Sequence, residues 1–114
     1  MTPFSILFIG HFIGDFLFQT SWIATYKETK WFTLLVHVMI YTATIAVLDY
    51  LTFQYLSIWG ILFIFVSHCF IDRQGIVNWW MKTITKTSPE SFPWLKIMID
   101  QIFHIIALAI ALQL

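Results

Sequence analysis

Four long apolar runs dominate the sequence, and short polar segments separate them. The runs cover residues 3–26, 31–51, 56–81 and 93–114. Each reaches the roughly 20 residues that an α-helix needs to cross the hydrocarbon core of a bilayer. A soluble helical bundle needs a polar face on each helix, and only 11% of the residues are charged. The sequence therefore predicts an all-α protein, a four-helix transmembrane bundle that forms one domain over residues 1–114.

The lysines lie almost entirely in the first and third connections between these runs. Lys27 and Lys30 occupy the first, Lys82 and Lys86 occupy the third, and Lys96 lies just inside the last run. Because Lys and Arg collect in cytoplasmic loops, both termini are expected outside the cytoplasm. The first run is too long for a cleavable signal, so it is expected to be retained. A net charge of zero with no basic tail excludes nucleic-acid binding, and the oligomeric state stays open.

The first run carries a polar stripe at helical spacing. His11, Asp15 and Gln19 are each four residues apart, which places them on one face of a helix. Gly10 and Gly14 repeat the spacing one position earlier and leave room for a neighbouring helix to approach closely. Polar side chains are costly in hydrocarbon and usually serve a function. We interpret the stripe as one wall of an intramembrane site.

Each of the other three runs also contains one histidine with a polar partner four residues away. The pairs are His37 with Tyr41, His68 with Asp72, and Asp100 with His104. Counted from the expected cytoplasmic ends at ~1.5 Å per residue, most of these groups lie roughly 6–16 Å deep, and His11 lies roughly 20 Å deep. The four helices are therefore expected to bring their polar residues into nearly one layer, in the cytoplasmic half of the membrane.

Imidazole and carboxylate groups together are the ligands of borderline divalent metal ions, and helix bundles build such sites from inward-facing pairs. We predict one or two ions, Zn or Mn. The candidate ligands are His11, Asp15, His37, His68, Asp72, Asp100 and His104. The candidate catalytic carboxylates are Asp15, Asp72 and Asp100, one of which would serve as general base. The candidates for orienting the ligands are Gln19, Tyr41, Gln101 and Arg73, and Arg73 could also pair with Asp72 or an anionic head group.

The same residues are compatible with two other kinds of polar layer. One is a metal-free path for protons or ions, and the other is a hydrogen-bond network that only fixes the register of the helices. The sequence alone leaves these alternatives open.

The polar blocks resemble a known family. The run Gly-His-Phe-Ile-Gly-Asp-Phe-Leu-Phe-Gln at 10–19 resembles the opening of the small bacterial and phage membrane proteins grouped as DUF family 3307, and Trp22 and Lys27 follow it as they do there. The later blocks also match, with His37 before Tyr41, Ser67-His68 before Asp72-Arg73, and Asp100-Gln101 before His104. More distantly, the His/Asp layout is similar to the LexA-regulated, membrane-bound metal-dependent hydrolases. The resemblance implies a bacterial or phage-encoded protein of the inner (cytoplasmic) membrane with an intramembrane His/Asp site.

These observations lead to one expected function and one main alternative. The first is a metal-dependent hydrolase of a lipid-linked phosphoester, with the bilayer and an anionic lipid as its partners. The alternative is a divalent-metal or proton transporter that uses the same residues as a transit site. An enzyme needs a fixed and closed ligand shell, whereas a transporter needs access from both faces of the membrane.

Overall fold

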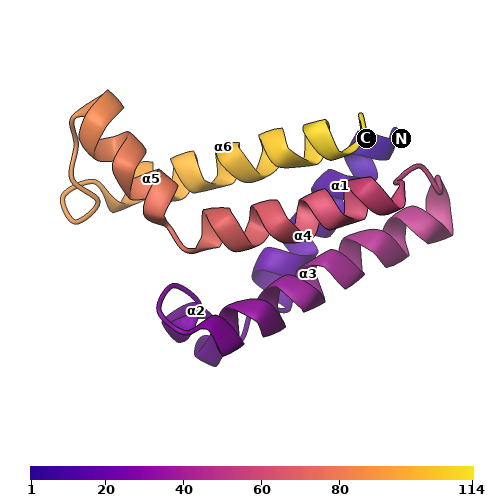
Figure 1. The fold of residues 1–114 in the computed structure, drawn as a ribbon, viewed down its shortest axis with the longest axis horizontal. Coiled ribbons are helices and arrows are strands. Elements are labelled where there is room, and N and C mark those ends of the chain that lie inside the picture. Colours follow the sequence, from indigo (N-terminus) through magenta and orange to yellow (C-terminus); the bar gives the residue numbers. More distant parts are fainter.

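The computed structural model describes all residues 1–114, and its regular elements are helices without any β-strand. The elements are α1 (Pro3–Phe12), the π-helical turn η1 (Ile13–Leu17), α2 (Ser21–Tyr26), α3 (Trp31–Thr52), α4 (Ile58–Asp72), α5 (Gly75–Trp80), the π-helical turn η2 (Met81–Thr85) and α6 (Pro93–Ala111). The prediction of an all-α protein is confirmed. Figure 1 shows α3, α4 and α6 running along the length of the molecule.

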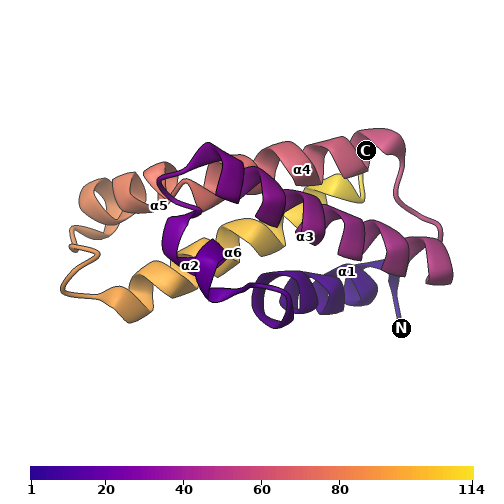
Figure 2. The ribbon, with the colours of Figure 1, turned by 90° about the horizontal axis from the view of Figure 1, so that it is seen from below.

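The helices pack in a simple order. α1 packs on α3, α3 packs on α4, and α4 packs on α6. Figures 1 and 2 place both termini at one end of the molecule, together with the connection between α3 and α4. The connections that carry the lysines, between α2 and α3 and between η2 and α6, lie toward the opposite end.

Two or three segments are long and apolar enough to cross a membrane, where the sequence predicted four. α3 and α6 each suffice alone. α4 and the segment Gly75–Thr85 qualify together, but they are bent by 57° at the break between them. The segment Pro3–Leu17 is apolar but shorter. The structure thus supports association with a membrane and gives fewer full-length spans than expected.

The predicted helix over residues 3–26 is wrong as a single element, because it breaks into three pieces. η1 widens the helix at Gly14 and Asp15, and the helical conformation ends at Leu17. A new helix then starts at Thr20, whose hydroxyl oxygen accepts a hydrogen bond from the backbone N–H of Ile23 at 3.3 Å. Because a capped helix start fixes a new direction for the chain, α2 packs against α3 instead of continuing α1.

The predicted helix over 56–81 is also interrupted, at Arg73 and Gln74. Gln74 has a φ of 67°, the left-handed conformation, which ends α4 and redirects the chain into α5. Its side-chain amide compensates for this strain by donating to the carbonyl of Ile71 at 3.3 Å and to Asp100 at 2.7 Å. The two remaining predicted helices, 31–51 and 93–114, differ from α3 and α6 only at their ends.

Gly14 is the point of closest approach between the first helix and α3. A methyl group added at Gly14 would lie 2.9 Å from Cδ2 of Tyr41 and 3.2 Å from its Cα. Gly10 lies against Ile45 in a similar way. This is the close packing that the glycine spacing predicts, and it holds Asp15 next to α3.

We therefore expect Gly14→Ala to lower the free energy of unfolding by about 1–3 kcal/mol, because the Tyr41 backbone has to move to admit the methyl group. Gly75→Ala is the matched control, since nothing lies within 4 Å of a methyl group added there. Thermal unfolding in detergent measures both. A Gly14→Ala protein as stable as the Gly75→Ala protein would contradict this packing.

Candidate metal centre

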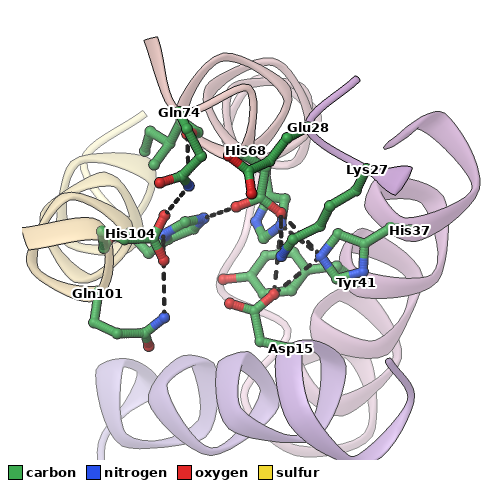
Figure 3. Close-up of polar contacts among 12 residues, drawn as sticks. Asp15, Lys27, Glu28, His37, Tyr41, His68, Gln74, Gln101 and His104 are labelled. Atoms are coloured by element: carbon green, nitrogen blue, oxygen red, sulfur yellow. Dashed lines mark hydrogen bonds and ion pairs between the residues drawn. The ribbon is translucent and has the colours of Figure 1, made fainter. Parts of the chain in front are cut away.

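Four side chains from three segments meet in the interior of the bundle. They are Asp15 from η1, His37 from α3, and His68 and Asp72 from α4, and each is less than 5% exposed. One ligand atom from each lies within 4.8 Å of the ligand atoms of the others. Figure 3 shows the side chains of Asp15, His37 and His68 converging from different elements. We call these four residues the inner group.

The spacing of the four ligand atoms in the inner group suits a metal ion. The atoms are Oδ1 of Asp15, Nε2 of His37, Nε2 of His68 and Oδ2 of Asp72. Five of the distances between them fall between 2.9 and 3.5 Å. A tetrahedral ion with bonds of about 2.0–2.1 Å holds its ligand atoms about 3.3–3.4 Å apart. The inner group is therefore a buried His/Asp cluster of the size that could hold one divalent ion.

Asp72 also belongs to a second cluster, which we call the outer group, with Asp100 and His104 of α6. The Oδ1 atom of Asp72 lies 3.1 Å from Nε2 of His104, while its Oδ2 atom faces the inner group. Asp100 approaches the same ring, with Oδ2 at 3.6 Å from Nδ1 of His104. Asp72 is thus placed to share its two oxygens between two neighbouring sites.

The Nε2 atom of the His104 ring faces Asp72. Its Nδ1–H donates to the backbone carbonyl of Asp100 at 2.7 Å, because a carbonyl oxygen can only accept. In a neutral ring the Nε2 atom then carries no proton, although it faces a carboxylate oxygen. Neither Nε2 of His104 nor Oδ1 of Asp72 has a hydrogen-bond partner. A metal ion between these two atoms, or a proton on Nε2, would satisfy both, so the pair fits either a metal site or an ion pair.

Asp100 is held by two amide donors. The Nε2 group of Gln74 donates to Oδ1 at 2.7 Å, and the Nε2 group of Gln101 donates to Oδ2 at 3.1 Å. Its side chain is 15% exposed, more than those of Asp15 and Asp72. Asp100 is therefore the most exposed carboxylate of the cluster.

His11 does not enter either group, although its sequence pattern made it a candidate ligand. The Gln101 amide donates to Asp100, so its oxygen faces His11 and accepts from the Nε2–H of that ring at 2.7 Å. The hydroxyl of Tyr41 then donates to Nδ1 of His11 at 2.7 Å. Both ring nitrogens are occupied, and His11 links Tyr41 to the residues that orient Asp100.

The two other candidates for orienting residues lie away from the cluster. Gln19 comes after the end of η1, and its buried Oε1 atom has no hydrogen-bond partner. The guanidinium of Arg73 lies over the ring of Trp31, with its Cζ atom 4.3 Å from the ring centroid, and does not pair with Asp72. Only Tyr41 and Gln101 of that set contact the cluster or its neighbours.

Lys27 is the residue at the cluster that the sequence did not single out. Its ammonium lies 3.2 Å from Oδ2 of Asp72, and its side chain is 17% exposed. Burial lowers the pKa of Lys27, but the carboxylates of Asp72 and Asp15 outweigh it and raise the pKa above its usual value. Two lysines form ion pairs in the structure. Lys27 is the one that contacts a carboxylate of the cluster, and Lys96 pairs with Glu28 at 3.4 Å.

A polar pocket connects the outer group to the surroundings. It has a volume of about 280 Å³ and is lined by Asp100, Gln74, Glu28, Lys96, Pro93 and Ile97. A neighbouring pocket of about 270 Å³ shares Lys96 and extends to Lys82. Both lie at the end of the molecule that holds the basic connections, so the cluster is approached from that end.

The opposite side of the cluster is closed by apolar side chains. Leu7, Ile45, Ile64 and Leu108 form a buried core together with the ring of Tyr41. The ring of Tyr41 also lies against that of His68, with 3.8 Å between the centroids and a tilt of 38°, and so helps to orient a histidine whose Nδ1 has no partner. Apart from the hydroxyl of Tyr41, the residues of this core carry no polar side-chain group.

The comparison with protein families identifies the chain. Residues 4–114 match the family described as "Protein of unknown function (DUF3307)". No curated protein and no solved structure matches the chain. The match covers nearly the whole sequence, so the chain belongs to the DUF3307 family, as its polar blocks suggested.

Proposed function

We propose that this member of the DUF3307 family is a membrane-embedded, metal-dependent hydrolase that acts on a lipid-linked phosphoester. The observation that supports a metal most strongly is the spacing of 2.9–3.5 Å among the inner-group ligand atoms. Two carboxylates and two imidazoles favour Zn or Mn over softer ions.

The two groups would take different roles. The inner group offers four protein ligands and is buried, as in closed metal sites. The outer group offers three and borders the polar pocket, which leaves a coordination position for water or substrate. A bound divalent ion polarises a phosphoryl oxygen and lowers the pKa of a coordinated water toward ~7. Asp100, held by Gln74 and Gln101 at the pocket, is the residue we assign as general base.

A lipid phosphate suits the surroundings of the cluster. The head group would lie in the polar pockets, where Lys82 attracts an anion at roughly 1 kcal/mol and Lys96, which pairs with Glu28, could be shared with it. An apolar groove of about 400 Å³ lies between α4 and α6 and is lined by residues such as Phe63, Phe70 and Phe103. It shares Ser67 and Ala107 with a small cavity against His68 and His104. A hydrocarbon chain could therefore lie beside the cluster without leaving the bilayer.

The closed apolar core argues for the enzyme over the transporter. A transit site needs access from both faces, and the core formed by Leu7, Ile45, Ile64 and Leu108 blocks one of them. The polar pockets are lined by residues of the lysine-bearing end.

The proposal is tested by incubating the purified, metal-loaded protein with phospholipids and polyprenyl phosphates. We expect release of phosphate or of a head group, its loss with a chelator, and its recovery when Zn or Mn is added back. The absence of turnover on every lipid, combined with metal or proton flux across sealed vesicles, would favour the transporter instead.

The proposed orientation places both termini outside the cytoplasm and the cluster near the cytoplasmic face. We expect a cysteine at Thr85 to be labelled from the cytoplasmic side and one at Phe53 from the outside, in a background without Cys69. Both positions are exposed. Labelling of inside-out and right-side-out vesicles with an impermeant reagent measures this, and the reverse pattern would contradict the orientation.

A further inference from the structure

If the histidines of the cluster are neutral, the charges around it do not balance without a metal. Asp15, Asp72 and Asp100 bring three carboxylates, and Lys27 is the lysine that contacts them. Buried carboxylates need compensating charge. With neutral histidines, one divalent ion and Lys27 together neutralise the three acids. A second divalent ion would leave an excess of two positive charges, which a phosphate dianion would neutralise.

The position of Lys27 suits contact with such an anion. It lies in the turn between α2 and α3, and its neighbour Glu28 forms part of the wall of the polar pocket beside Asp100. Its ammonium lies 3.2 Å from Oδ2 of Asp72, the oxygen that faces the inner group. A divalent ion bound by that oxygen would repel the ammonium strongly at such short range. A long and flexible side chain can then turn toward an acceptor on the open side of the ion.

We propose that Lys27 is an anion-binding residue of this site, which pairs with Asp72 in the metal-free protein and with a phosphate oxygen of the ligand once metal is bound. The inference rests on the proposed function for its ligand class, a phosphate or phosphoester. It adds the residue that recognises the charge of that ligand.

The proposal predicts opposite effects of one substitution on two binding constants. Lys27→Met removes a positive charge that competes with the metal, so the affinity for Mn²⁺ should rise by about tenfold or more. The same change removes a charge-assisted hydrogen bond to phosphate, so inorganic phosphate should bind the Mn²⁺-loaded protein about tenfold or more weakly. Competition with a chromogenic chelator measures the first constant, and calorimetry in detergent measures the second.

Lys30→Met is the matched control. Lys30 lies in the same turn, but it is exposed and its ammonium lies over the ring of Tyr26 at 4.3 Å. Both constants should stay close to those of the wild type. Lys27→Arg keeps the charge and should retain phosphate binding. If Lys27→Met does not fold, Lys27→Gln, which can still donate to Asp72, should show the same opposite pair of effects.

Three results would overturn the proposal. A rise in Mn²⁺ affinity with unchanged phosphate affinity would mean that Lys27 only compensates charge. A fall in both affinities would mean that it only supports the fold. Failure of inorganic phosphate to bind the Mn²⁺-loaded wild type would remove the ligand altogether. None of these measurements requires turnover, so a failed hydrolase assay would be a separate finding.

Discussion

Asp72→Asn is expected to reduce the affinity for Zn or Mn by at least about 100-fold. Asp72 is the residue common to both groups, and it is fully buried. Loss of a residue that merely orients a ligand typically costs 10–100-fold in metal affinity, so loss of a shared anionic ligand should cost more. The substitution preserves the size of the side chain, and it leaves His37, His68 and His104 without the negative charge between them.

Asp49→Asn is the control for this prediction, because Asp49 is also buried but lies outside the cluster. Its two oxygens accept hydrogen bonds from the backbone N–H groups of Tyr55 and Leu56, which fixes the connection between α3 and α4. We expect this variant to lose stability and to keep its metal. Equal metal affinity in the Asp72→Asn variant and the wild type, measured by chelator competition, would remove Asp72 from the site.

Asp100→Asn is expected to lower kcat by about 10²–10⁴-fold, the usual contribution of a general acid or base. Asn fills the same space beside Gln74 and Gln101, but it cannot take up a proton from the attacking water. Because Asp100 is not a member of the inner group, that group should keep its ion. Phosphate release from a lipid substrate, measured at saturating metal, gives the rate.

Two controls make the result on Asp100 specific. The metal content must equal that of the wild type, so that the loss of rate is not a loss of the ion in the outer group. Wild-type rates in a metal-saturated Asp100→Asn protein would show that another group acts as the base. If the wild type hydrolyses no lipid but carries metal ions or protons across vesicle membranes, and Asp100→Asn abolishes that flux, Asp100 would belong to a transport site instead.

The residues of the cluster could be found from the sequence because two kinds of evidence agree, the spacing of four residues along each helix and the depth of each residue in the bilayer. Pairs four residues apart, such as His68 with Asp72, lie on one face of a helix whatever packs against it. The depth of each pair, measured from the end of its apolar run, then places the polar residues of all four runs in nearly one layer, since the runs have similar lengths. The structure brings six of the seven candidate ligands together on this basis. Their role as ligands stays a prediction.

The positions of Lys27 and Gln74 at the cluster could not be predicted, because they result from breaks in the helices that the periodicity of the sequence does not reveal. If residues 3–26 formed one straight helix, Lys27 would lie about 18 Å along the axis from Asp15. The break before Thr20 brings it to Asp72 instead. Thr20 before an apolar segment was the available signal, as a helix start, and Gly75 was the corresponding signal for the bend at Gln74. His11 fell outside the groups because tertiary hydrogen bonds use both its nitrogens.

The most direct test of the metal centre is the metal content of the purified protein, combined with X-ray absorption at the edge of the metal found. We predict one or two ions of Zn or Mn per chain, with nitrogen and oxygen ligands at about 2.0–2.2 Å. The signal should be lost in Asp72→Asn and kept in Asp49→Asn. A folded wild-type protein that takes up no divalent ion when Zn or Mn is supplied would contradict the account.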